Sequence, residues 1–352
     1  ICFGSASCTP KRSGFILRMV STTRPLRAFQ LRVPRSPRDA MRMLKEATVS
    51  SAAGRSGPRA RARKIRTGRS MGEMLPGPDP SVQVMPALLA FFFLTFTAIA
   101  TAAWPEGKRS KWHGYERLDF TLPGEGARCI VVNPKTAAEG RPWIWRARFW
   151  GHQPALDLQL LEKGFHLAYC EVGGLFGAPA AVARWDKFHA LAVKQGLSAR
   201  PVLEGMSRGG LIIVNWASAN PGKVAAVYGD NPVCNFNSWP GGKNGKFSKR
   251  DWQRCLKAYG LTEATAPGHR QPFSPATLKP LADRKVPIAL VLGLADKVVP
   301  VAENGELLAV NYQSLGGPVR VWRKPAKGHH PHGLHPPDEL VAWILQAMRG
   351  DF

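Results

Sequence analysis

The sequence predicts an α/β fold with a mostly parallel sheet and helices on both of its faces. Short apolar runs alternate with helical patterns along residues 112–350, which is typical of such sheets. A Gly-x-Ser-x-Gly motif at residues 205–209 lies between a predicted strand and a predicted helix. Polar residues follow three later strands, and sites in these sheets gather at the carboxyl ends of the strands.

The first half of this region contains three expected strands and two expected helices. Residues 116–121 alternate between polar and apolar types, which predicts an edge strand. Continuous apolar runs predict buried strands at 129–134 and 165–170. Helices are expected at about 154–163 and 179–195, since each of these segments is followed by a glycine, a common helix terminator.

The second half continues the alternation, with one interruption. Residues 232–285 are rich in Gly, Lys, Asn and Pro and break the rhythm, so we expect an insert or small lid there. The other expected elements are a strand at 201–206, a helix from about 211 to the Pro221-Gly222 pair, strands at 224–228, 287–292 and 319–322, and a last helix at 337–349.

The N-terminal segment differs in composition from the rest of the chain. Residues 1–84 hold 17 of the 49 Lys and Arg residues but only four of the 24 Asp and Glu residues. They are rich in Arg, Ser, Pro and Gly and predict a disordered leader. Because the first residue is Ile1, one interpretation is untranslated sequence upstream of the true start. A basic segment that binds nucleic acid or targets an organelle is the alternative.

An uncharged segment follows at residues 85–103. Its apolar core and the small residues up to Ala103 predict a secretory signal peptide with cleavage near Trp104. The protein would then be secreted or periplasmic. An uncleaved membrane anchor is the alternative, since the segment is about long enough to span a bilayer. Residues 104–352 would form one α/β-type domain.

The serine of the motif, Ser207, is the candidate nucleophile. A strand, a sharp turn flanked by glycines and a helix form the context that places such a serine at the tip of a strained turn. Glycines are needed there because side chains would clash with neighbouring backbone. A serine needs a base that takes its proton and an acid that orients the base.

The candidate acid is Asp296, three residues after the strand at 287–292. Asp230, which follows the strand at 224–228, is the alternative acid. Asp296 could instead only cap a helix that begins near Pro300.

The candidate base comes from a cluster of histidines after the last strand. His329 is favoured, and His330 and His332 are the alternatives. The cluster could also bind a metal, but no acidic or cysteine ligands accompany it. We therefore expect neither a metal nor a cofactor. Whether Cys234 and Cys255 form a disulfide stays open.

The order Ser, Asp, His along residues 112–350 resembles the α/β-hydrolase superfamily. Within it, the chain resembles exported bacterial esterases of the prolyl-oligopeptidase-like group. The Ser-Arg-Gly sequence is similar to that of glucuronoyl esterases. The resemblance implies that Ser207 is the nucleophile, Asp296 the acid and His329 the base. It also implies that the Arg208 N–H helps to bind the oxyanion, and that the Arg208 side chain meets the substrate.

The chain departs from the common lipase pattern, since no His-Gly-Gly-Gly run follows the strand at 129–134. We expect the segment 141–151 to form the equivalent loop, with a backbone N–H near Trp145 as the second oxyanion donor. This segment holds three tryptophans and three arginines, and Trp239 and Trp252 follow later. Tryptophan faces suit sugar rings and arginines suit carboxylates.

These features favour a serine esterase that acts on a small-molecule or carbohydrate ester. A serine peptidase of the same fold is one alternative, although residues 104–190 are too few for the propeller domain of prolyl oligopeptidases. A non-catalytic binding protein is the other alternative. We expect no nucleic-acid partner for the folded domain, and no stable membrane partner unless the 85–103 segment is uncleaved.

Overall fold

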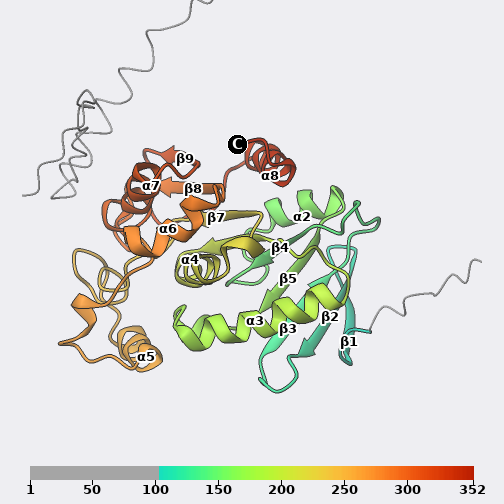
Figure 1. Cartoon of the computed structure of the whole chain (residues 1–352), viewed down its shortest axis with the longest axis horizontal. Coiled ribbons are helices and arrows are strands. Elements are labelled where there is room, and N and C mark those ends of the chain that lie inside the picture. Colours follow the sequence, from blue (N-terminus) through green and yellow to red (C-terminus); the bar gives the residue numbers. More distant parts are fainter. Residues whose placement is uncertain (1–102) are drawn as a thin grey trace, which may run out of the picture.

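The computed structural model describes residues 103–352, which form a nine-stranded sheet between two layers of helices (Figure 1). The strands lie in the spatial order β1-β2-β3-β5-β4-β6-β7-β8-β9. In chain order they are β1 (Gly107–Trp112), β2 (Tyr115–Thr121), β3 (Arg128–Val132), β4 (Trp143–Arg146), β5 (His166–Cys170), β6 (Val202–Met206), β7 (Ala226–Asp230), β8 (Ile288–Gly293) and β9 (Val319–Lys324).

The helices cover the two faces unequally. On one face lie α3, α4, α6 and α7, and on the other lie α2 and α8 (Figure 1). Their bounds are α2 (Ala155–Glu162), α3 (Pro179–Lys194), α4 (Gly209–Ala219), α5 (Lys249–Tyr259), α6 (Pro275–Asp283), α7 (Gly305–Ser314) and α8 (Asp338–Arg349). Short 3₁₀ turns are η1 (Gly173–Leu175), η2 (Pro221–Lys223), η3 (Ala266–Gly268) and η4 (Val301–Glu303).

The strand directions confirm the predicted fold class. Strands β1, β2, β3 and β5 pair antiparallel, whereas every pair from β5 across to β9 is parallel. Every strand expected from the sequence is present, with bounds that differ by up to two residues. Parallel strands with both faces covered are buried throughout, which explains their continuous apolar runs.

One central strand differs from the sequence expectation. The segment 141–151 was expected to be a loop, but Trp143–Arg146 forms β4 between β5 and β6. Trp143 and Trp145 pack on the face of α3 and α4, while Ile144 packs on the opposite face. The strand was missed because it is only four residues long and ends in an arginine.

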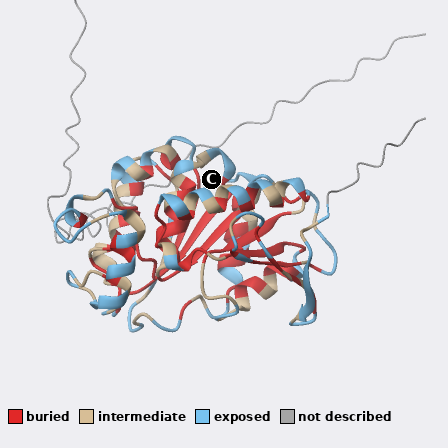
Figure 2. Ribbon diagram, turned by 90° about the horizontal axis from the view of Figure 1, so that it is seen from below, coloured by how far each residue is buried: buried red, intermediate tan, exposed pale blue. Residues whose placement is uncertain are grey.

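The core lies on both faces of the sheet and follows the alternation of side chains along each strand. Cys129 and Val131 of β3 face the larger layer of helices, and Ile130 and Val132 face α2 and α8. Figure 2 shows the buried strands between helices whose outer sides are exposed. This two-sided burial fixes the register of each strand, because a shift by one residue would exchange the faces.

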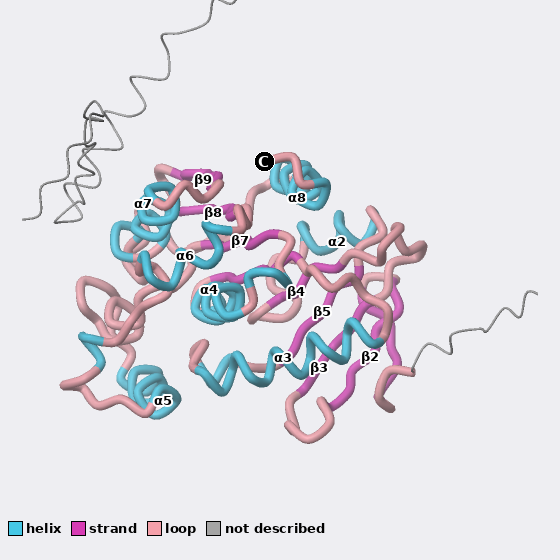
Figure 3. The backbone as a smooth tube through the Cα atoms, in the orientation of Figure 1, coloured by secondary structure: helices cyan, strands magenta, loops and turns pink. Residues whose placement is uncertain are grey.

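The connection between β7 and β8 extends beyond the sheet on one side (Figure 3). It contains α5 and α6, and a third apolar cluster beneath α5 includes Phe236 and Trp252. Cys234 and Cys255 are both buried and free, so the disulfide left open by the sequence is not formed.

The expected leader at 1–84 and nearly all of the expected signal segment at 85–103 lie outside the described residues. Between residues 103 and 352, no helix is both long and apolar enough to cross a bilayer.

His166 in β5 predicts a specific acid sensitivity of the fold. The pKa of His166 is lowered from its ordinary value of 6.5 to about 4. Burial is the main cause, the hydrogen bond with the Pro142 carbonyl opposes it, and the Arg141 charge adds to it. Between these two pH values the unfolded chain binds a proton that the folded protein excludes. Stability from this group is therefore complete above about pH 6.5 and decreases as the pH falls toward 4.

We expect His166→Asn to have a flatter dependence of Tm on pH between 6.5 and 4 than the wild type. Thermal unfolding across this range checks it, with the exposed His113→Asn as the control. If Tm falls with pH as steeply in His166→Asn as in the wild type, another group causes the loss of stability in acid.

Candidate active site

The candidate site residues lie at or just after the carboxyl ends of neighbouring parallel strands. Met206 at the end of β6 pairs with Asp230 at the end of β7, and Asp230 pairs with Val291 of β8. Gly293 at the end of β8 pairs with Lys324 at the end of β9. Segments far apart in the sequence therefore meet at one edge of the sheet, as expected for this fold class.

Ser207 occupies a strained turn between β6 and α4. Its φ is 48°, in the left-handed region that costs a non-glycine residue about 1–3 kcal/mol. The turn is held because the Ser207 N–H donates to the Asp230 carbonyl at 2.9 Å and the Ser207 carbonyl accepts from the Val233 N–H at 2.8 Å. Backbone on either side thus fixes the serine at the start of α4.

The glycines of the motif are required by close contacts. A Cβ on Gly205 would lie 2.6 Å from Ile213 Cδ1, and one on Gly210 would lie 2.6 Å from Pro232 Cβ. Real side chains do not approach so closely. The motif therefore lets β6, α4 and the segment after β7 pack tightly around the serine.

Three predicted residues form a continuous hydrogen-bonded series. His329 Nε2 lies 3.0 Å from Ser207 Oγ, and His329 Nδ1 lies 2.7 Å from Asp296 Oδ2. Ser207 and Asp296 are buried, and the His329 side chain is 10% exposed. With Nδ1 protonated toward the carboxylate, Nε2 is free to accept the serine proton.

Asp296 also orders its own turn. Its second oxygen, Oδ1, accepts hydrogen bonds from the N–H groups of Val298 and Val299, each at 2.8 Å. Asp296 does not cap a helix, because the 3₁₀ turn η4 begins at Val301 without a side-chain cap. The two N–H donors hold the carboxylate so that Oδ2 faces His329.

Asp230, the alternative acid, pairs with His332, an alternative base, and neither of them contacts the Ser207 hydroxyl. His332 Nδ1 lies 2.6 Å from Asp230 Oδ1, and both side chains are fully buried or nearly so. Asp230 Oδ2 also accepts from the Tyr228 hydroxyl at 2.8 Å and from the Gly333 N–H. This second Asp–His pair anchors the segment that carries His329.

His330, the other alternative base, is exposed. Its pKa is lowered mainly by partial burial and then by the neighbouring His332 and His329. Its ring contacts His329 edge to face, with centroids 5.1 Å apart.

Asn231 is a positioning residue that the sequence did not reveal. Its side-chain NH₂ donates to the carbonyls of Gly328 and His329 at 3.3 and 3.0 Å, and its carbonyl oxygen accepts from the Gly293 N–H at 2.7 Å. It thus ties the end of β8 to the His329 segment. Its place directly after the end of β7 was the available signal.

The segment after β4 passes beside the start of α4. The Arg148 backbone N lies 4.0 Å from the position that a Cβ on Gly209 would take. Among residues 103–352, the Arg148 and Arg208 N–H groups donate to no protein acceptor. Both N–H groups thus lie close to the start of α4 without a protein acceptor in the described part of the chain.

Trp145 lies elsewhere than the sequence suggested. It is fully buried in β4 and stacks on Trp185 with ring centroids 3.9 Å apart. The interpretation that Trp143 and Trp145 face a substrate is wrong, because the central strand directs both indoles into the core. Trp252 is also buried.

A buried ionic group lies beneath the serine turn. Arg146 pairs with Asp157, and its Nη2 lies 3.6 Å from Glu204 Oε1. Burial raises the pKa of Glu204 well above its ordinary value, opposed by Arg146 and assisted by Asp157. Burial also raises the pKa of Asp157, which the Arg146 charge opposes, so the single buried arginine is shared by two carboxyl groups that both resist ionisation.

The structure also groups His152 with His330 and His332. One ring nitrogen of each lies within 4.8 Å of the others. Two of the three residues are exposed, and His332 Nδ1 already pairs with Asp230. The expected histidine cluster thus exists as a group, with His152 added from the segment before α2.

Comparisons with known proteins bear on the fold. No family model and no curated protein sequence matches the chain. Among solved structures, a puromycin-hydrolyzing peptidase from Mycobacterium tuberculosis superposes with a TM-score of 0.51 at 16% identity, covering 66% of this chain and 38% of that one. Dipeptidyl peptidase 4 from Porphyromonas gingivalis superposes with a TM-score of 0.50 at 15% identity, covering 67% and 36%.

The chain therefore spans less than two fifths of the length of these two proteins. The similarity and the strand order together show that residues 103–352 have the α/β-hydrolase fold.

The tight packing at Gly210 gives a testable prediction. Because an added Cβ would clash with Pro232 and Val233, we expect Gly210→Ala to destabilise the protein by about 1–3 kcal/mol. Denaturant unfolding measures this loss. Gly268→Ala is the matched control, since no atom lies within 4 Å of its added Cβ. Equal stability of the two variants would contradict the packing described for the turn.

Proposed function

We propose that the protein is a serine hydrolase that cleaves a carboxylic ester through an acyl-enzyme. The observation that carries this proposal is the series of hydrogen bonds from Ser207 through His329 to Asp296. The α/β-hydrolase fold supports it, because this fold presents a serine at the same strand-to-helix turn.

In the first half of the reaction Ser207 Oγ attacks the ester carbonyl carbon. His329 Nε2 takes the serine proton, and Asp296 stabilises the imidazolium that results. The C–O bond to the alcohol then breaks, and the alcohol leaves with the proton from Nε2. The acyl group remains bonded to Ser207 Oγ.

In the second half water replaces the alcohol. His329 Nε2 removes a proton from water, the hydroxide adds to the acyl carbonyl, and the bond to Ser207 Oγ breaks. The serine regains its proton and the carboxylic acid is released. The ester and one water are consumed, and Ser207 and His329 return to their starting states.

The oxyanion formed in each half needs donors that are already in place. We assign this role to the N–H groups of Arg208 and Arg148, which lie on either side of the start of α4 and have no other protein acceptor within the described residues. Fixed donors of this kind stabilise charge that develops only in the transition state.

The ester preference extends the proposal beyond the fold. Within the described residues the segment 104–190 forms β1–β5, α2 and α3, so no propeller lies there that would restrict access to short peptides. Because Trp143, Trp145 and Trp252 are buried, the carbohydrate part of the substrate prediction loses its main support. We propose the ester without naming a sugar, and we retain secretion as part of the proposal.

Hydrolysis of an aryl ester tests the function directly. We expect the purified protein to hydrolyse 4-nitrophenyl acetate and Ser207→Ala to lose this activity to the background level, because within residues 103–352 Ser207 Oγ is the one hydroxyl or thiol bonded to His329 Nε2. Release of 4-nitrophenol is the readout. A wild type that cleaves no member of an aryl ester panel would overturn the esterase proposal. Turnover of peptide amides alone would favour the peptidase.

The two Asp–His pairs give a second test. We expect Asp296→Asn to lower kcat by about 10⁴, because an amide would favour the wrong tautomer of His329. Asp230→Asn should lower kcat far less and lower the melting temperature more than Asp296→Asn, because Asp230 contacts His332 and Gly333 rather than His329. Steady-state kinetics and thermal unfolding of both variants check this. A larger kinetic loss in Asp230→Asn would assign the acid to Asp230.

A further inference from the structure

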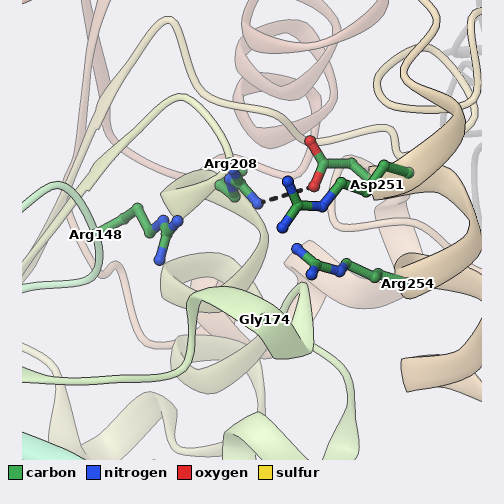
Figure 4. Close-up of a pocket in the computed structure, with 6 residues that line it drawn as sticks. Arg148, Gly174, Arg208, Asp251 and Arg254 are labelled. Atoms are coloured by element: carbon green, nitrogen blue, oxygen red, sulfur yellow. Dashed lines mark hydrogen bonds and ion pairs between the residues drawn. The ribbon is translucent and has the colours of Figure 1, made fainter.

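A pocket lined by arginines opens beside the serine turn (Figure 4). Its volume is about 430 Å³. Its lining comes from the segment after β4, from η1, from the start of α4 and from α5, and consists of Arg148, Gly174, Arg208, Arg250, Asp251 and Arg254. Figure 4 shows Arg148 on one side, Asp251 and Arg254 on the other, and Arg208 between them.

The charges in this pocket are not balanced. Four guanidinium groups face one carboxylate of the lining, Asp251, which lies 3.4 Å from Arg208 Nη1. Glu171 adds one more negative charge, 3.2 Å from Arg148 Nη1. Between residues 103 and 352, Arg250 and Arg254 have no ion-pair or hydrogen-bond partner for their side chains. Two positive charges thus remain for a ligand.

Arg208 is held rigidly at the wall nearest the serine. Its guanidinium lies over the rings of Phe176 and Trp239, 5.6 and 5.5 Å from their centroids. Burial lowers the pKa of Arg208, the Arg148 charge lowers it further, and Asp251 opposes the shift. Crowded cations of this kind are stabilised when an anion lies among them.

Gly174 leaves the floor of the pocket open. No atom lies within 4 Å of the Cβ that another residue would carry there. Its backbone therefore borders free space rather than packed side chains. A group of several heavy atoms can enter without displacing the chain.

We propose that this pocket binds an oxyanion group of the substrate, so that the hydrolase acts on esters that also carry a carboxylate, sulfate or phosphate. The inference rests on the serine hydrolase proposed above. Arg208 adjoins Ser207 in the chain, and Arg148 supplies the proposed second oxyanion donor. An anion held by their side chains therefore places the ester beside the nucleophile, and planar guanidinium groups suit such anions.

Matched neutral and anionic esters test the substrate class. One pair, 3-acetoxybenzoate and 3-acetoxybenzamide, places the charge on the alcohol part. The other pair, monomethyl glutarate and methyl glutaramate, places it on the acyl part. We expect kcat/KM to favour the anionic member of at least one pair by about tenfold or more, and the KM of that member to rise with added NaCl. 3-Acetoxyphenyl phosphate and sulfate compare the other anions.

Substitutions on α5 locate the effect. Arg250→Gln and Arg254→Gln should each reduce the preference for the anionic ester about tenfold, chiefly through KM. Lys257→Gln is the control, because Lys257 is exposed on the same helix but does not line the pocket. Equal behaviour of all three variants would overturn the inference.

A binding measurement separates this inference from the proposed function. Titration calorimetry of the full chain with glutarate, sulfate and inorganic phosphate needs no catalysis. Binding that weakens about tenfold in Arg254→Gln but not in Lys257→Gln supports the pocket even if no ester is cleaved. Ester cleavage without anion binding and without a preference for anionic esters would overturn the inference about the pocket, while the proposed hydrolase function would stand.

Discussion

The left-handed turn at Ser207 is the constraint on which the site depends. A serine with φ of 48° is unfavourable by itself, so the surrounding packing must hold it. Hydrogen bonds to the Asp230 carbonyl and the Val233 N–H supply part of this support. The close approach of β6, α4 and the segment after β7 at Gly205 and Gly210 supplies the rest.

The same edge of the sheet also positions the histidine. Asp230 is the last residue of β7, and Asn231 follows it directly. Asn231 holds the segment that begins at Gly328 through two carbonyls, and Asp230 holds it through His332. The orientation of His329 therefore depends on the strand next to the serine as well as on Asp296. This arrangement explains why two Asp–His pairs occur side by side, of which only one reaches Ser207 Oγ.

Most of the fold and the central residues of the site could be predicted from the sequence. Continuous apolar runs marked the parallel strands, and the order of Ser207, Asp296 and His329 matched their places after β6, β8 and β9. β4 was missed because a four-residue strand has no clear periodicity. The place of Asn231 directly after β7 was a signal, but its role depends on contacts with segments distant in the sequence, and so does the arginine pocket.

The central claim is that Ser207 is a nucleophile activated by His329. The most direct measurement is the mass shift of the intact protein after reaction with a fluorophosphonate, followed by peptide mapping of the adduct. We predict one adduct per chain, located on Ser207, and a much slower reaction in His329→Gln. An unmodified wild-type protein, or an adduct on another residue, would contradict the account.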